Sequence, residues 1–149
     1  MKKQEIVLVK KLRLFEILLR AGICAMFLAH GMLALTGNEN WVPLITSFGI
    51  GDHAAKLLLP AIGLMDVVVA WTIIVNPSRA LILWTVAWPF LTALSRPISG
   101  QPIWEFIERT PNWVLPLVWL WMKGFPRSWK ELWKHEPLEE NYTTDLQVA

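Results

Sequence analysis

The chain has 149 residues, of which 54% are hydrophobic and only 17% are charged, and its mean hydropathy is +0.41. These values lie outside the range of ordinary soluble domains, and the apolar residues fall into blocks, so we expect one compact integral membrane domain. The net charge of only +2 argues against a nucleic-acid partner, because the positive residues cluster at the ends of the apolar blocks, where lipid headgroups would lie.

Residues 14–36 form an apolar run long enough to cross a bilayer, yet they contain Glu16, Arg20 and His30. An ionisable group inside such a span costs at least ~2.5 kcal/mol, so it usually has a partner or a task. At about 100° per residue, the three side chains fall on one broad face of a helix. We therefore expect this face to point into a protein interior rather than into lipid.

A mixed segment over residues 41–56 is too polar to cross a membrane and too apolar for a free loop. Its apolar residues recur at i, i+3, i+4 and i+7, which predicts a short helix at the membrane interface with one face in the acyl region. They are Trp41, Leu44, Ile45 and Phe48. Trp41 would anchor this helix at headgroup level.

Two further spans are predicted over residues 57–75 and 80–95, separated by an Asn-Pro-Ser turn. Ser78 in this turn can cap the second of these helices. Asp66 lies near the middle of the first, and Gly63 indicates a close contact between helices.

The predicted fold is all-α, an integral membrane four-helix bundle with short interfacial helices, in a single domain over residues 1–135. The fourth span, residues 111–123, is short, since at about 1.5 Å per residue it does not cover the ~30 Å hydrocarbon core. A capping box and an apolar stripe predict a cytoplasmic interfacial helix over residues 128–135. Residues 136–149 read as an acidic tail that is free or docks on a partner.

The positive residues also predict a topology. With both termini in the cytoplasm, ten Lys and Arg residues fall on the cytoplasmic side and only Lys56, Arg96 and Arg109 fall outside. This bias follows the positive-inside rule and predicts a multi-pass protein of the cytoplasmic membrane.

Arg20, His30 and Asp66 could meet between the first two spans. If Ala25 and Asp66 are level, Arg20 and His30 each lie about 7.5 Å from that level. An Arg20–Asp66 pair would neutralise two costly charges, with Glu16 next to Arg20 on the cytoplasmic side. Two interpretations stay open: a lock between two helices, or a polar pocket that binds a small molecule such as a quinone or relays a proton through His30 and Asp66.

A second polar cluster is predicted at the outer mouth, and it reads either as interfacial ion pairs or as a substrate entrance. Its members are Arg96, Glu105, Glu108 and Arg109. Trp84 and Trp88 share one face of the third span, which suits helix packing or an aromatic wall for a flat ligand.

Metal and disulfide chemistry find little support in the sequence. Cys24 is the only cysteine, so the chain cannot form an internal disulfide, a C-x-x-C redox pair or a thiolate metal cage, and we expect Cys24 to be a packing residue. No metal-ligand spacing is present, and His30 has no second histidine at matching depth for a haem. We expect no covalently bound cofactor and no metal site.

Four short motifs follow one another along the chain. They are Leu-Arg-Ala-Gly at 19–22, Phe-Leu-Ala-His-Gly at 27–31, Phe-Gly-Ile at 48–50 and Gly-Leu-Met-Asp at 63–66. This order resembles the DoxX family of four-helix bacterial membrane proteins over residues 14–122. By that match Arg20, Gly31 and Asp66 are the family-type positions, although the family more often has glutamate at the last and a lysine shortly after the glycine.

The resemblance implies an accessory subunit of a quinone-linked redox system in the bacterial inner membrane, often without a redox centre of its own. A purely structural or assembly subunit and a small-solute transporter remain as alternatives. The expected partners are the lipid bilayer and other membrane subunits, with a quinone as an exchangeable ligand, and no catalytic residue is identified.

Overall fold

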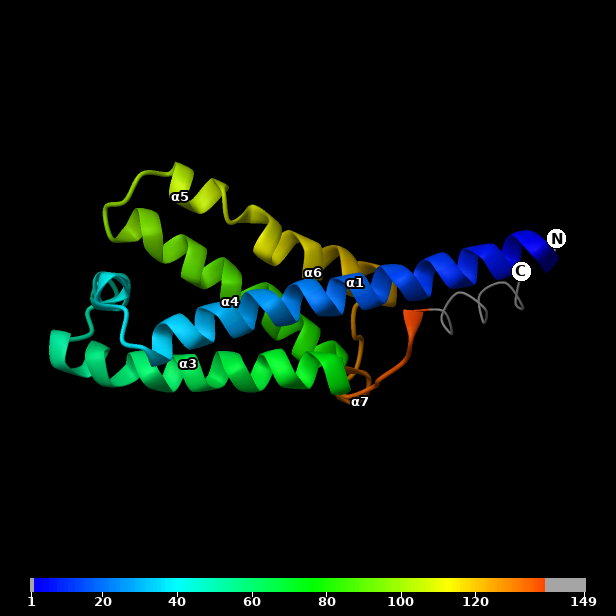
Figure 1. The fold of residues 1–149 in the computed structure, drawn as a ribbon, viewed down its shortest axis with the longest axis horizontal. Coiled ribbons are helices and arrows are strands. Elements are labelled where there is room, and N and C mark those ends of the chain that lie inside the picture. Colours follow the sequence, from blue (N-terminus) through cyan, green and yellow to red (C-terminus); the bar gives the residue numbers. More distant parts are fainter. Residues whose placement is uncertain (1, 139–149) are drawn as a thin grey trace.

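The computed structural model describes residues 2–138, and every regular element in that range is helical (Figure 1). The predicted tail from residue 139 onward lies outside the described residues. In chain order the elements are α1 (Lys2–Leu35), the 3-10 helix η1 (Glu39–Trp41), α2 (Val42–Thr46), α3 (Asp52–Val75), α4 (Arg79–Ile98), α5 (Trp104–Ile107), α6 (Thr110–Lys123) and α7 (Trp129–Leu132).

Three of these helices are long and apolar enough to cross a membrane: α1 over Ile6–Leu35, α3 and α4. Helix α6 has only 14 residues. At about 1.5 Å per residue it is shorter than the ~30 Å hydrocarbon core of a bilayer, as its sequence predicted.

The helices extend beyond the predicted membrane spans. Helix α1 begins at Lys2, before the predicted span at residue 14, because the basic segment ahead of the apolar run consists largely of good helix formers. Helix α3 begins at Asp52 rather than at residue 57, with Gly51 as its N-cap and an acidic side chain in its first turn, where the helix dipole favours one.

The ends of α4 and α7 also differ from the prediction. Helix α4 passes through Pro89 and Pro97 and ends at Ile98, beyond the predicted residue 95. Helix α7 covers only four residues of the predicted 128–135. The predicted caps are confirmed, since the Ser78 hydroxyl accepts a hydrogen bond from the backbone of Leu81 and the Ser128 hydroxyl accepts one from that of Glu131.

The helices pack as two antiparallel pairs, α1 with α3 and α4 with α6 (Figure 1). The first pair meets at two glycines. A Cβ atom on Gly63 would lie 2.7 Å from the carbonyl oxygen of Gly31, and one on Gly31 would lie 2.8 Å from that of Gly63. Only glycine allows the two backbones to approach so closely, which confirms the predicted contact at Gly63.

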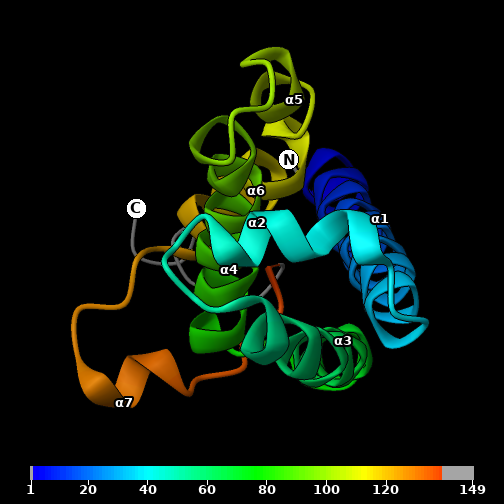
Figure 2. The same cartoon turned by 90° about the vertical axis from the view of Figure 1, so that its left-hand side faces the viewer.

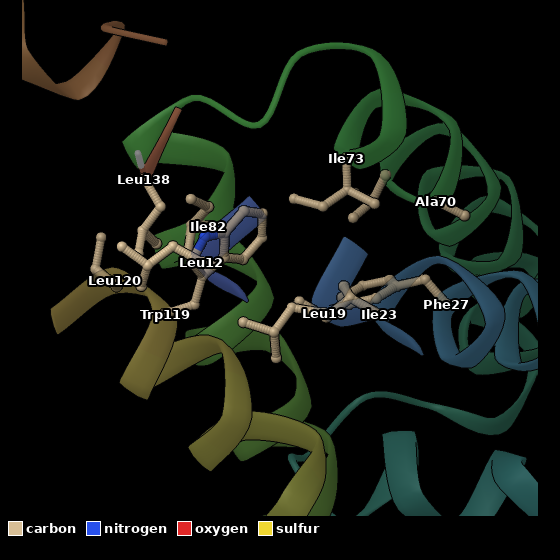
Figure 3. Close-up of a cluster of buried hydrophobic side chains, with 11 residues drawn as sticks. Leu12, Leu19, Ile23, Phe27, Ala70, Ile73, Ile82, Trp119, Leu120 and Leu138 are labelled. Atoms are coloured by element: carbon tan, nitrogen blue, oxygen red, sulfur yellow. The ribbon is translucent and has the colours of Figure 1, made fainter. Parts of the chain in front are cut away.

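A buried apolar cluster joins the two pairs (Figure 3). Its largest fully buried side chain is Trp119 of α6, and the same cluster contains Phe27 of α1, Ile73 of α3 and Ile82 of α4. Cys24 is half-buried against this cluster, so its prediction as a packing residue is confirmed.

The molecule has two ends with different structures. We call the end with the 36–51 and 99–109 connections the loop end, and the end with the α3–α4 link and the end of α6 the terminal end. Helix α2 lies across the loop end, between α1, α3 and α4 (Figure 2). It therefore covers the space between the helix pairs at that end.

Candidate functional site

The predicted Arg20–Asp66 ion pair is wrong. The guanidinium of Arg20 bonds instead to the Glu16 carboxylate of its own helix at 2.9 Å. Gly31 packs against Gly63 and Val67, so Asp66 lies level with the loop end of α1 and not with Arg20. The glycine contact fixes the register between α1 and α3 and thereby keeps Arg20 away from Asp66. The four residues of the predicted site, Glu16, Arg20, His30 and Asp66, are therefore divided between two sites.

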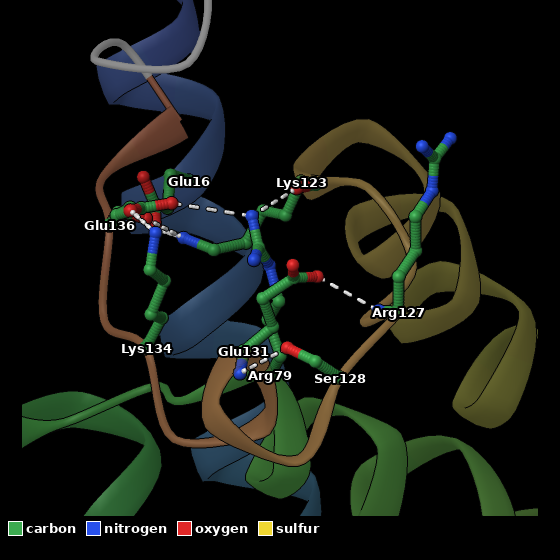
Figure 4. Close-up of polar contacts among 8 residues, drawn as sticks. All are labelled: Glu16, Arg79, Lys123, Arg127, Ser128, Glu131, Lys134 and Glu136. Carbon is green, nitrogen blue, oxygen red and sulfur yellow. Dashed lines mark hydrogen bonds and ion pairs between the residues drawn. The ribbon is translucent and has the colours of Figure 1, made fainter.

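The first site is an ion network at the terminal end (Figure 4). Glu16 is only 4% exposed, and its carboxylate accepts hydrogen bonds from Arg20 at 2.9 Å, from the Lys123 ammonium at 3.1 Å and from the backbone N–H of Leu138 at 2.8 Å. Lys123 also donates to the carbonyl of Glu136 and lies 5.6 Å from the ring of Trp119. Such a buried carboxylate is fully neutralised by its neighbours.

This network also holds the segment after α7. Arg79 donates to the Lys123 carbonyl at 2.8 Å and to the Glu136 carboxylate at 3.3 Å, while Lys134 pairs with Glu136 at 3.1 Å. Leu138 is fully buried in the apolar cluster. The start of the predicted acidic tail is therefore docked on the body of the chain itself, rather than free or held by a partner.

The second site is a cavity of about 330 Å³ at the loop end. Helices α1, α2, α3 and α4 all contribute to its wall, which is mostly apolar. Trp41, Leu44, Ile45 and Phe48 of the predicted interfacial helix line it. This face is therefore turned in part toward the other helices, with Leu44 buried, while Phe48 stays 55% exposed.

His30 contributes one of the polar groups in the wall. Its Nδ1 lies 2.9 Å from the carbonyl oxygen of Met26, and its ring stacks on Trp41 with a centroid distance of 5.7 Å and an interplanar angle of 24°. Because a carbonyl only accepts, the proton of the neutral ring must be on Nδ1, and Nε2 remains as an acceptor.

Asp66 contributes the second polar group. Its side chain is 4% exposed and lines the same cavity, but its Oδ1 has no hydrogen-bond partner among the described residues. The Trp88 side chain lines the same cavity beside this carboxyl group. A buried carboxyl group with so few partners is costly, so it is a place where a ligand or a proton would be stabilised.

Three of the four residues of the predicted outer cluster form ion pairs with one another, while the fourth, Arg96, bonds to Gln101. Arg109 binds Glu105 at 2.9 Å and Glu108 at 2.7 Å, and Arg96 bonds to Gln101 at 3.2 Å. Arg96 and Arg109 also line the cavity, so this cluster adjoins the site of His30 and Asp66. Glu16 and Arg20 do not line it.

One site residue, Lys123, was missed from the sequence. Lys123 was counted as a headgroup charge at the end of a span, although its place four residues after Trp119 in an apolar helix was a signal that it could fold back over the ring. Trp88 was assigned to packing or an aromatic wall, and both hold: it stacks on Trp84 with centroids 5.6 Å apart and an interplanar angle of 8°, and it lines the cavity.

Within the described residues, no three His, Cys, Asp or Glu side chains gather in a way that could hold a metal ion. Polar groups able to bind an organic ligand are those of the cavity wall. Comparisons of the chain with models of protein families, with curated proteins and with solved structures gave no match.

Proposed function

We propose that this chain is an integral membrane subunit of a quinone-linked redox system, similar to DoxX proteins, and that the loop-end cavity is its quinone site. The observation that carries the proposal is the cavity itself, of about 330 Å³. Ligand sites typically have volumes of about 300–1,000 Å³, mostly apolar walls and a few convergent polar groups.

The chemistry of the wall fits the head of a quinone. Trp41 and Trp88 supply flat aromatic surfaces, while His30 and Asp66 supply two polar groups on facing helices. Aromatic rings stack favourably on such surfaces, and polar groups inside a membrane commonly mark binding sites or proton paths. The subunit would act as an accessory, with the electron-transfer centre in a partner.

The test is the quinone content of the purified chain. Extracted from membranes in mild detergent, the wild-type protein should carry quinone that solvent extraction and mass spectrometry can quantify. Thr92→Trp, which fills the cavity, should lose it, while Trp71→Phe on the exposed side of α3 should keep it. Equal amounts of quinone in wild type and Thr92→Trp would refute the proposal.

The membrane topology belongs to the same proposal, with four spans and both termini in the cytoplasm. In a Cys24→Ala background, a cysteine placed at Gln101 of the loop end should react with an impermeant thiol reagent added outside intact cells. A cysteine at Lys130 should react only after the cells are opened. The opposite pattern would reverse the orientation.

An assembly role is the second candidate, and exposed tryptophans favour it. Trp129 and Trp133 stack edge to face at 6.1 Å beside the terminal end and are 73% and 61% exposed. Such paired aromatic side chains suit a protein interface. Native mass spectrometry of the extracted protein should detect a complex that Trp129→Ser with Trp133→Ser dissociates, and a lone wild-type monomer would count against this role.

A further inference from the structure

We propose that the loop-end cavity binds an anionic amphiphile, a molecule with one apolar chain and a carboxylate or phosphate head, and that Arg96 holds the head. This proposal goes beyond the proposed function, because it concerns another part of the cavity and needs no redox chemistry. The part concerned is formed by Arg96, Arg109 and Asn112, and we call it the arginine wall.

Arg96 differs from the other arginines that are at least partly buried. Each of the others forms an ion pair with a carboxylate, and they are Arg20, Arg79 and Arg109. Within residues 2–138, Arg96 forms no ion pair: its Nη1 donates to the neutral side-chain oxygen of Gln101 at 3.2 Å, and its buried Nε has no hydrogen-bond partner. A partly buried cation without a contacting anion is unfavourable, so a ligand anion beside Nε would be stabilised.

The acidic side chains of the outer cluster are bound to Arg109. Glu105 and Glu108 both accept hydrogen bonds from its Nη1, at 2.9 Å and 2.7 Å. Arg96 is influenced by these two carboxylates, and by the like charge of Arg109, only at longer range. The contact position beside the Arg96 guanidinium is therefore left for an anion that is not part of the described chain.

Asn112 adds a second donor to the arginine wall. Its side-chain amide lines the cavity and makes no hydrogen bond with the part of the chain that the structure describes. Asn112 also lies in the first turn of α6, where the helix dipole favours negative charge. Carboxylate and phosphate oxygens accept hydrogen bonds from both amide and guanidinium groups, so the two side chains suit the same anionic head.

The rest of the cavity suits a hydrocarbon chain. Its volume is about 330 Å³, and most of its wall is apolar. The aliphatic side chains include Leu44, Ile45, Leu58, Leu59, Ile62 and Leu91. Arg96 lies in the last turn of α4, and the end of a membrane helix lies near the lipid headgroups. A chain between the helices would therefore bring its head to Arg96, which favours an amphiphile over a free anion.

The experiment compares two ligands that share a chain and differ in charge. The purified chain in phosphatidylcholine nanodiscs is titrated with radiolabelled oleate and with methyl oleate, and binding beyond that of empty nanodiscs is measured. We expect oleate to bind at least about tenfold more tightly, which is the effect of one hydrogen bond to a charged group.

Two further probes identify the source of the anion. Oleoyl lysophosphatidate carries a phosphate head on the same chain, and inorganic phosphate is a head without a chain. Whichever of oleate and lysophosphatidate binds more tightly identifies the preferred head. Inorganic phosphate should bind at least about tenfold more weakly than either, because it lacks the apolar contacts.

Variants assign the preference to the cavity. Arg96→Gln removes the charge and should bring the ratio of oleate to methyl oleate affinities toward one. Lys56→Gln is the matched control and should keep the wild-type ratio, because Lys56 pairs with Asp52 and does not line the cavity. Thr92→Trp, which fills the cavity, should weaken the binding of both ligands. Thermal unfolding verifies that each variant is folded, and the wild-type ratio tests the proposal without any variant.

The outcomes separate this proposal from the proposed function. Equal wild-type affinities for oleate and methyl oleate would overturn it, as would a preference that folded Arg96→Gln retains. Inorganic phosphate that binds as tightly as oleate would indicate a free-ion site and overturn it too. Unchanged binding to Thr92→Trp would place the chain outside the cavity. A purified chain without quinone would overturn the proposed function alone.

Discussion

The two polar sites place carboxylates of equal burial in opposite surroundings. Glu16 at the terminal end and Asp66 at the loop end are each 4% exposed. Glu16 accepts three hydrogen bonds, two of them from cations, whereas Asp66 Oδ1 has no partner among the described residues. A buried carboxyl group whose hydrogen bonds are satisfied stabilises one arrangement of the chain, while one that is unsatisfied costs stability and gains from a ligand.

From this comparison we expect substitution of Glu16 to cause the largest loss of stability. Glu16→Ala should lower the free energy of unfolding by about 3–5 kcal/mol, because the buried cations of the network lose the carboxylate that balances them. Chemical denaturation in detergent measures this change. The matched control is Glu105→Ala in the half-exposed outer cluster, where surface pairs contribute only about 0–1 kcal/mol. Equal effects at both positions would contradict the assignment of the terminal end as structural.

The next effect is expected at the glycine contact that sets the level of Asp66. Gly63→Ala should destabilise by about 1–3 kcal/mol, because its methyl group would lie 2.7 Å from the Gly31 carbonyl oxygen. Gly22→Ala is the control in the same helix pair, since nothing lies within 4 Å of its Cβ position, and it should be neutral or stabilising. Tolerance of Gly63→Ala would mean that the α1–α3 register is not fixed by this contact.

Replacing Asp66 should change the free energy of unfolding in the opposite direction to replacing Glu16. Asp66→Leu removes a buried acceptor without a partner and should raise the free energy of unfolding by on the order of 1 kcal/mol. The same variant should lose the ligand. If Asp66→Leu destabilised the protein as strongly as Glu16→Ala does, Asp66 would have to be a structural group.

The smallest effect concerns the N-terminus of α7, outside the apolar helices. The backbone N–H of Arg127 donates to the Glu131 carboxylate at 2.8 Å and lowers the pKa of Glu131 below its usual 4.5. A lowered pKa means that this contribution to stability is present above 4.5 and is lost as the pH falls through the folded-state pKa. NMR titration of the Glu131 carboxyl carbon measures the shift. Arg127→Pro, which lacks the N–H, should restore the ordinary value, and a wild-type midpoint at or above 4.5 would disprove the hydrogen bond.

The apolar runs and the helix caps in the sequence predicted most of the secondary structure. Runs of about 20 apolar residues predicted α1, α3 and α4, and Ser78 and Ser128 predicted two helix starts. Helix α1 extends beyond its predicted span, because the basic residues before the apolar run also favour a helix and hydropathy alone does not show where the helix begins.

The pairing of polar side chains could not be read from the sequence. Spacing along one helix correctly placed Arg20 one turn from Glu16, since that relation is local. The partner of Asp66 depended on the register between α1 and α3, which a backbone contact at Gly31 and Gly63 fixes. Lys123 and Leu138 lie more than a hundred residues from Glu16 along the chain, so their contacts with it depend on how distant segments pack and not on local spacing.

By itself the sequence determined a helical, strongly apolar chain with ionisable residues inside its first two long helices, because composition and periodicity are local properties. The tertiary structure decided which of those residues meet. Packing of two glycines set the level of α3 against α1, and the docking of residues 136–138 neutralised Glu16. A cavity remained where α2 covers the gap between the helix pairs, and Asp66 lines it with an Oδ1 atom that has no hydrogen-bond partner among the described residues.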